Sequence, residues 1–317
     1  ILLIGDGNGL TQISATALAN GGELSLTQLK NIGFLKTQSS DDFTTDSAGG
    51  ATAIATGHKV PNRAIGVDDI GNPLKNITEI LAENGFISGL VTSDEITGAT
   101  PSAFYAHQKD RSMAEEIRTD LLKSHLSIFV AKDSENPAFA EAFGDFTMLG
   151  SVDEIQTSEN DQVGFLFTKD SPLKDEPIDL STALKNTLHF LSKKKKSFFL
   201  MVEGAKIDSY GHANDIGGVI REGIAFDSAV GTALKFADEN PKTLVIVTAD
   251  HETGGLTIPQ GKLGGHEIEG DFTTDDHTGV LVPIFAYGPQ SDEFRGVYEN
   301  NKLFSKMLKV MVVEVEE

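Results

Sequence analysis

Apolar runs that alternate with helix-like segments constrain the fold of this chain most strongly. Several runs are apolar along their whole length, and a strand of that kind is normally buried on both faces. We expect strands at residues 1–4, 86–92, 126–131, 163–167, 197–202, 243–248 and 280–287. Helical segments separate these runs, so the sequence predicts an α/β fold with a mainly parallel central sheet and helices on both faces.

The helical segments show either a periodic apolar face or small residues that suit close packing. We expect helices at residues 11–20, 48–56, 75–84, 112–123, 181–192, 215–237 and 302–312. Residues 254–276 are rich in glycine, and we expect an irregular loop insertion there. No internal repeat or linker divides the chain, so residues 1–317 are expected to form one domain. The chain begins inside an expected strand, and we expect further residues upstream of Ile1.

The charge balance restricts the partners of this chain. Lys and Arg total 26 and Asp and Glu total 47, which gives a formal net charge of −21. Such a surface repels nucleic acid and anionic lipid, so no nucleic-acid-binding surface is expected. No apolar run is long enough to span a membrane. Cysteine is absent, which excludes disulfides and thiolate metal ligands. An anionic substrate would therefore need metal ions held by oxygen and nitrogen ligands.

Residues 44–53, with the sequence Thr-Thr-Asp-Ser-Ala-Gly-Gly-Ala-Thr-Ala, indicate a loop that opens into a helix of small residues. Ser47 falls at the N-cap or in the first turn, where free backbone N–H groups and the helix dipole favour a negative group. A serine hydroxyl there can be stabilised as an alkoxide and can hold a phosphoryl group. The alternative is an ordinary helix with Ser47 or Asp46 as its cap.

Side chains that suit metal ions follow the expected strands. Ligands gather beyond the carboxyl ends of the strands in open α/β sheets. The candidates after these strands are Asp6, Thr100, Glu203, Asp250 and His251, and His277 precedes the last strand. Asp208 and His212 are four residues apart, which places both on one face if this segment is helical.

We expect the carboxylates of Asp6, Asp46, Glu203, Asp208 and Asp250 to converge. Carboxylates crowded in that way without cations would be strongly destabilised. Histidine with carboxylate is a typical ligand set for zinc, whereas Asp, Glu and Thr oxygens suit magnesium. The other histidines are expected to be surface or satisfied core residues; they are His58, His107, His125, His189 and His266.

The chain resembles the alkaline phosphatases. The run from Thr45 to Ala53 is similar to the nucleophile signature of that family. The other matching motifs occur in the family's order and are Gly5-Asp6-Gly7, Ala99-Thr100-Pro101, Val202-Glu203-Gly204, Ile207-Asp208, Gly211-His212, Thr248-Ala249-Asp250-His251 and His277-Thr278-Gly279. The resemblance extends from the first strand to residue 289. It implies an alkaline-phosphatase-like three-layer sandwich.

The resemblance also implies a role for each matching residue. Ser47 is expected to be the nucleophile that becomes phosphoserine. One zinc would bind Asp208, His212 and His277. A second zinc would bind Asp6, Asp250, His251 and the Ser47 oxygen. Magnesium would bind Asp6, Thr100 and Glu203. Arg111 falls where the family places its phosphate-binding arginine, and Asp46 would orient it. Two zinc ions can stabilise the attacking and leaving oxygens of an in-line displacement, and an arginine can donate two parallel N–H bonds to phosphate.

The implied activity is hydrolysis of phosphate monoesters, with inorganic phosphate as product and two Zn²⁺ and one Mg²⁺ per chain. A homodimer and a periplasmic or secreted location follow from the resemblance. Gly98 and Ser209 depart from it, because relatives often carry Asp or His at the first position and Lys or Trp at the second. We therefore expect a weak magnesium site, which Gly98→Asp would tighten unless Gly98 needs a positive φ.

Two other functions remain open from the sequence. The first is a phosphodiesterase of the same superfamily, which Arg111 disfavours because this residue suits the free oxygens of a monoester. The second is a non-catalytic metal- or phosphate-binding protein, which would have no need of Ser47. Turnover of a monoester and of the matching diester distinguishes these alternatives.

Overall fold

A computed structural model describes residues 1–133, 143–167 and 179–311. The strands are β1 Leu2–Gly5, β2 Asn31–Lys36, β3 Ile87–Glu95, β4 Leu126–Lys132, β5 Thr147–Met148, β6 Val163–Phe167, β7 Phe198–Gly204, β8 Val245–Thr248, β9 Glu252–Thr253, β10 Thr257–Lys262, β11 Glu267–Asp271, β12 His277–Thr278, β13 Val282–Tyr287 and β14 Gly296–Glu299. The α-helices are α1 Leu10–Ala19, α2 Ser47–Thr56, α3 Ile77–Glu83, α4 Ala99–Ser102, α5 Ala114–Lys123, α6 Glu154–Thr157, α7 Leu180–Lys193, α8 Lys206–His212, α9 Ile216–Glu239 and α10 Lys302–Val310. Short 3-10 turns lie at Leu26–Gln28, Leu263–Gly265 and Ser291–Phe294.

A ten-stranded sheet forms the centre of the described structure, in the order β14-β2-β13-β8-β1-β7-β3-β4-β6-β5. All neighbouring pairs are parallel except the two that β13 makes with β8 and β2, which are antiparallel. The predicted α/β fold with a mainly parallel sheet is confirmed. Because β13 runs in reverse, its beginning lies at the edge where the parallel strands end.

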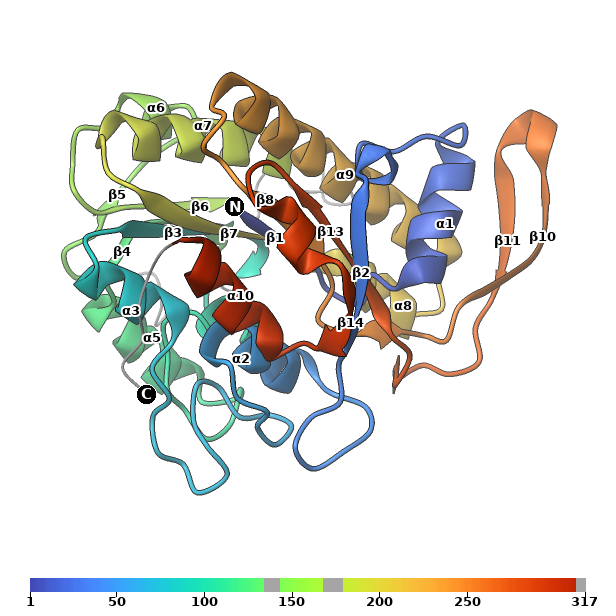
Figure 1. Cartoon of the computed structure of the whole chain (residues 1–317), viewed down its shortest axis with the longest axis horizontal. Helices are drawn as coiled ribbons and strands as arrows, with labels where there is room; N and C mark the ends of the chain where they lie inside the picture. The colour runs from blue at the N-terminus through green and yellow to red at the C-terminus, as the bar shows by residue number, and fades with distance from the viewer. Residues whose placement is uncertain (134–142, 168–178, 312–317) are drawn as a thin grey trace.

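Two hydrophobic cores cover the two faces of this sheet. Leu2 and Ile4 of β1 contribute to one core and Leu3 to the other, and all three are fully buried. This is the consequence of the two-residue period of a strand. Helices α7, α9 and α1 lie over one face, whereas α2, α3, α5 and α10 lie over the other (Figure 1). The predicted helices on both faces are confirmed.

One local expectation was wrong, and some strands of the sheet were not predicted. Residues 254–276 are not an irregular loop, because β10 and β11 pair there as an antiparallel hairpin that extends beyond the sheet (Figure 1). Strands β2 and β14 were not expected either. Both lie at one end of the sheet and are largely exposed or half-buried, so they lack the continuous apolar pattern on which the prediction relied. The sequence also predicts an acidic segment with helical and irregular parts at 134–162 and a connection at 170–179, and both fall partly outside the described residues.

Candidate active site

Ser47 is the first residue of α2, and Asp46 is the N-cap of this helix. The Asp46 side chain accepts a hydrogen bond from Gly49 N–H at 2.9 Å. The Ser47 hydroxyl is buried and lies 3.3 Å from His251 Nε2. All ten residues of α2 are buried. A Cβ at Gly50 would lie 3.1 Å from the Asp250 carbonyl oxygen, so the small residues let this helix pack directly against the loop that follows β8.

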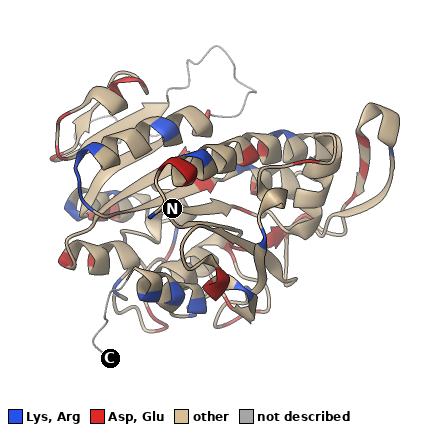
Figure 2. Ribbon diagram, turned by 45° about the horizontal axis from the view of Figure 1, so that its top comes forward, with Lys and Arg blue, Asp and Glu red and all other residues tan. Residues whose placement is uncertain are grey.

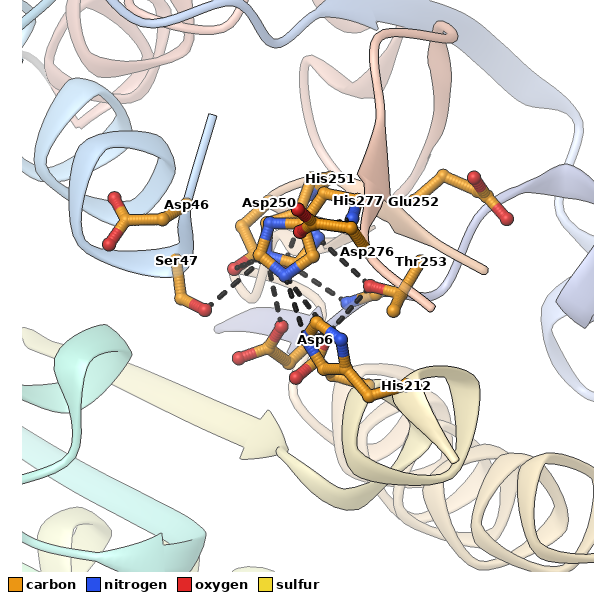
Figure 3. A network of polar contacts seen from close by, with 12 residues as sticks. Asp6, Asp46, Ser47, His212, Asp250, His251, Glu252, Thr253, Asp276 and His277 are labelled. Atoms are coloured by element: carbon orange, nitrogen blue, oxygen red, sulfur yellow. Dashed lines mark hydrogen bonds and ion pairs between the residues drawn. The ribbon is translucent and has the colours of Figure 1, made fainter. Parts of the chain in front are cut away.

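The first group of candidate metal ligands consists of Asp6, Asp250 and His251, and all three are buried. Asp6 follows β1 and Asp250 follows β8, and these two strands are parallel neighbours. Nε2 of His251 lies 3.3 Å from Asp6 Oδ1 and 3.3 Å from Asp250 Oδ2. The same nitrogen faces the Ser47 hydroxyl, so the group lies directly beside the predicted nucleophile (Figure 3).

The second group consists of Asp208, His212 and His277. Asp208 and His212 lie on α8, which confirms the helical spacing of this pair. Nε2 of each histidine lies 3.4 Å from Asp208 Oδ1. The Nδ1 atoms instead face backbone carbonyls, of Asp275 at 2.6 Å for His212 and of Thr45 at 2.8 Å for His277. This arrangement leaves both Nε2 atoms free for a metal ion, as in protein zinc sites.

An antiparallel ribbon brings His277 to the other ligands. Strand β12 pairs with β9, so that His277 lies opposite Thr253 and Thr278 lies opposite Glu252. The buried Glu252 carboxylate holds this ribbon, because it accepts hydrogen bonds from the side chains of Gln12 and Thr278. The rings of His251 and His277 stack with centroids 3.6 Å apart. The two ligand groups are therefore adjacent.

The predicted magnesium ligands come from neighbouring strands. Glu203 ends β7 and Asp6 follows β1, and the Thr100 hydroxyl of α4 donates to Asp6 Oδ2 at 3.4 Å. The Thr92 hydroxyl of β3 donates to Glu203. Burial, followed by the charge of Asp94, raises the pKa of Glu203 to about 8. All three oxygen-bearing side chains are buried, and the charge of Glu203 acts on Asp6. Oxygen donors of this kind are the ligands that magnesium prefers.

Asp46 was expected to converge with the other carboxylates, and this was wrong. Its side chain lies apart from the histidine cluster (Figure 3) and accepts a hydrogen bond from Arg111 Nη1 at 3.0 Å. The reason is its N-cap position, which turns the carboxylate toward Gly49 N–H and Arg63 N–H. Burial raises the pKa of Asp46, but these two backbone hydrogen bonds and the Arg111 charge together bring it below its usual value.

The electrostatics of the cluster fit bound cations. Burial raises the pKa of Asp6 well above its usual value, and the charges of Asp250, Asp208 and Glu203 raise it further. Asp6 Oδ1 and Asp250 Oδ2 are buried and have no hydrogen-bond partner among the described residues. Orphaned carboxylate oxygens beside convergent imidazole nitrogens are the donors that a zinc ion requires. The residues present therefore fit metal ions at both ligand groups.

Several residues that support the site were not found from the sequence. The Thr253 hydroxyl donates to Asp208 Oδ1 at 2.5 Å, and a Cβ at Gly7 (φ +69°) would lie 2.7 Å from this hydroxyl oxygen. Arg63 accepts the Arg111 N–H with its carbonyl at 2.8 Å and forms a two-pronged ion pair with Asp110 at 2.8 Å. Gly7 belongs to the Gly5-Asp6-Gly7 motif and Thr253 lies two residues after His251, so their closeness to predicted ligands is a usable signal. Arg63 and Asp110 lie 47 positions apart and gave none.

Comparison with known proteins places these residues in a family. The profile of the family described as "Alkaline phosphatase" matches residues 1–129, 167–269 and 266–313. "Alkaline phosphatase 4" of Bacillus subtilis (strain 168) is 30% identical to the chain over 406 aligned positions, covering 98% of this chain and 88% of that protein.

Solved structures agree with this match. The alkaline phosphatase of the Antarctic bacterium TAB5 superimposes with a TM-score of 0.92 at 42% identity, covering 99% of this chain and 97% of that one. A structure of a variant of that enzyme, with Mg bound in its M3 site, has a TM-score of 0.89 at 41% identity. It again covers 99% of this chain and 97% of that one. The sequence family, the fold and the clustered ligands agree, and the chain belongs to the alkaline phosphatase family.

Proposed function

We propose that this chain hydrolyses phosphate monoesters through a phosphoserine at Ser47, with two Zn²⁺ and one Mg²⁺ in the three ligand groups described above. Membership of the alkaline phosphatase family makes it a metal-binding phosphomonoesterase. The observation that carries the finer proposal is the position of Ser47. Its hydroxyl lies at a helix N-terminus and within 3.3 Å of a nitrogen of one ligand group.

The chain's own residues support a displacement at phosphorus. The backbone N–H groups of the first turn of α2 favour negative charge on Ser47 Oγ and on a phosphoryl group attached to it. Bound Zn²⁺ and Mg²⁺ would supply positive charge that lowers the pKa of the serine hydroxyl and stabilises the attacking and leaving oxygens. The Asp208 group is partly exposed whereas the Asp6 group is buried, so the alcohol would depart, and water would enter, on the Asp208 side.

Arg111 is the proposed phosphate-binding residue. Asp46 holds its Nη1 atom, and the guanidinium carries further N–H donors for phosphate oxygens. A monoester presents more free anionic oxygens than a diester. The arginine therefore favours monoesters over diesters.

Partners and location are also proposed. The net charge is −21, and Lys and Arg are spread over several helices (Figure 2), which supports the absence of a nucleic-acid-binding surface. None of the helices in the described part of the chain has both the length and the hydropathy needed to cross a bilayer. We propose a homodimer in a periplasmic or secreted location, as the family resemblance implies.

Parallel turnover of p-nitrophenyl phosphate and bis(p-nitrophenyl) phosphate by the Zn²⁺- and Mg²⁺-loaded protein tests the proposal. We expect the monoester to react faster by on the order of 10- to 100-fold in kcat/KM, about the value of one hydrogen bond to a charged group. Faster turnover of the diester would identify a phosphodiesterase. No turnover of either ester would indicate a protein that only binds metal or phosphate.

A further inference from the structure

A carboxylate from another position fills the space beside Gly98. A Cβ added to Gly98 would lie 2.8 Å from Asp94 Oδ2. Gly98 has a φ of −55°, so its backbone conformation does not require glycine. The Asp94 N–H donates to Thr92 Oγ1 at 2.9 Å, and the Thr92 hydroxyl donates to Glu203. Asp94 is thus connected through Thr92 to Glu203, a proposed magnesium ligand.

An ammonium group is paired with this carboxylate. Lys206 Nζ donates to Asp94 Oδ1 at 3.0 Å, and each side chain is about one third exposed. Lys206 begins α8, and the preceding Ala205 N–H donates to Ser93 Oγ at 2.8 Å. This bond joins the loop after β7 to the end of β3, which fixes the two halves of the pair relative to each other. The charges of Glu203 and Asp6 also act on the Lys206 ammonium.

We propose that Asp94 and Lys206 are positioning residues that set the affinity of the third site for Mg²⁺. The inference rests on the proposed function, because that function places Mg²⁺ on Asp6, Thr100 and Glu203. A dication there is attracted by the Asp94 carboxylate and repelled by the Lys206 ammonium. The Asp94–Lys206 ion pair is therefore almost neutral as a whole. It lies beside Gly98, the position at which relatives often carry an ionisable side chain.

Substitutions of Lys206 and of Asp94 should change the affinity for Mg²⁺ in opposite directions. Lys206→Met removes the repulsion and leaves Asp94 as an unpaired carboxylate beside the ion, so Mg²⁺ affinity should rise by about 10-fold. Asp94→Asn removes the attraction and leaves an unpaired ammonium, so affinity should fall by about 10-fold. Losses of groups that contact metal ligands change affinity by roughly 10- to 100-fold in other proteins. If the pair only supported the fold, both substitutions would weaken binding.

Equilibrium dialysis against graded Mg²⁺, followed by metal analysis, measures this affinity without reference to activity. The protein is first loaded with two equivalents of Zn²⁺ per chain. Lys75→Met is the matched control, because it removes the lysine that precedes α3 and pairs with Glu83 of that helix. Lys206→Gln is a second variant, in which the side chain keeps a donor for Asp94 and loses only the charge.

We expect both Lys206 variants to bind Mg²⁺ more tightly than the parent protein, Asp94→Asn to bind it more weakly, and Lys75→Met to be unchanged. Weaker binding in all three site variants, or equal binding in all of them, would overturn the inference. A parent protein that hydrolyses monoesters but takes up no Mg²⁺ would also overturn it while leaving the proposed function intact. Absence of hydrolysis at full metal load would instead contradict the proposed function.

Discussion

Asp46 connects the helix that bears Ser47 to Arg111 through its two carboxylate oxygens. Oδ1 accepts the Gly49 and Arg63 backbone N–H groups, and Oδ2 accepts Arg111 Nη1. One side chain thereby caps the helix of the proposed nucleophile and orients the proposed phosphate-binding guanidinium. The second task depends on its negative charge.

Asp46→Asn should weaken phosphate binding while leaving zinc content unchanged. The amide oxygen can still cap α2, but an NH₂ group would then face the Arg111 guanidinium. We expect kcat/KM for p-nitrophenyl phosphate to fall by on the order of 10-fold, with a matching rise in the inhibition constant of inorganic phosphate, because a hydrogen bond to a charged group is lost. Asp69→Asn, on the exposed acceptor of the Ser40 hydroxyl, is the control. An unchanged inhibition constant would contradict this role of Asp46.

At the scale of elements, an ion pair fixes α3 to the loop that leads to Arg111. Glu79 belongs to the capping box of α3, and its Oε1 lies 3.1 Å from His107 Nε2. His107 Nδ1 faces the Gly66 carbonyl at 2.8 Å. His107 was predicted to be an ordinary satisfied histidine, and these contacts are of that kind.

The pair should make stability depend on pH. Burial lowers the pKa of His107, but Glu79 and the Gly66 carbonyl raise it above its usual value; burial raises the pKa of Glu79, but His107 and the Asn76 N–H lower it. The His107 contribution is full below its unfolded pKa of about 6.5 and is lost as the pH rises through the folded value. The Glu79 contribution is full above its unfolded value and is lost as the pH falls.

His107→Gln should therefore destabilise the protein by about 1 kcal/mol at pH 6 and by less at pH 9. Urea unfolding of the metal-loaded protein at both values measures the difference. His58→Gln is the control, since His58 Nδ1 contacts only the nearby Thr56 carbonyl among the contacts described. An equal loss at the two pH values would show that His107 acts by packing rather than by charge.

The sequence predicted the elements that depend on local pattern. Continuous apolar runs identified β1, β3, β4, β6, β7, β8 and β13, because these strands are buried on both faces. Strands β2 and β14 and the hairpin β10–β11 do not carry the continuous apolar run of a strand buried on both faces. The pairing of β2 and β14 also depends on partners that are distant in the sequence. The antiparallel direction of β13 was likewise not evident, although it is what brings His277 to the site.

For the candidate site too, local pattern predicted some residues, whereas residues that act through distant partners were missed. Asp6, Glu203, Asp250 and His251 were predicted to be close because they follow strands of one mainly parallel sheet. The structure groups Asp6, Asp250 and His251, and the charge of Glu203 acts on Asp6 from the neighbouring strand. Asp94, Lys206 and Arg63 could not be found in this way. Each acts through a partner that is distant in sequence, and an isolated charged residue gives no sign of its partner.

At the scale of the molecule, we propose that residues 1–317 form one domain, with the hairpin β10–β11 as a small insertion. The two hydrophobic cores share the single ten-stranded sheet, so neither can unfold without exposing the other. The domain should therefore melt in one transition, with equal calorimetric and van't Hoff enthalpies.

Metal removal should lower the stability of the whole molecule. Ions that bind the native state alone stabilise it by about 2.7 kcal/mol at 100 times their dissociation constant, and their loss leaves Asp6, Asp250 and Glu203 buried close to one another. We expect EDTA to lower the melting temperature by roughly 5 to 10 °C. The check is a pair of thermal scans at neutral pH, with metal content confirmed as zero. An unchanged melting temperature would count against the ligand groups.

Trapping of the phosphoenzyme tests the central claim most directly. The zinc-loaded protein is mixed with a ³²P-labelled phosphate monoester, quenched in acid and digested, and the labelled peptide is sequenced. We predict label on Ser47 alone, and none in Ser47→Ala protein that retains its zinc, because the carboxylate and imidazole ligands of both zinc groups lie elsewhere in the chain. Parent protein that turns over the ester but carries no label, or carries it on another residue, would contradict the account.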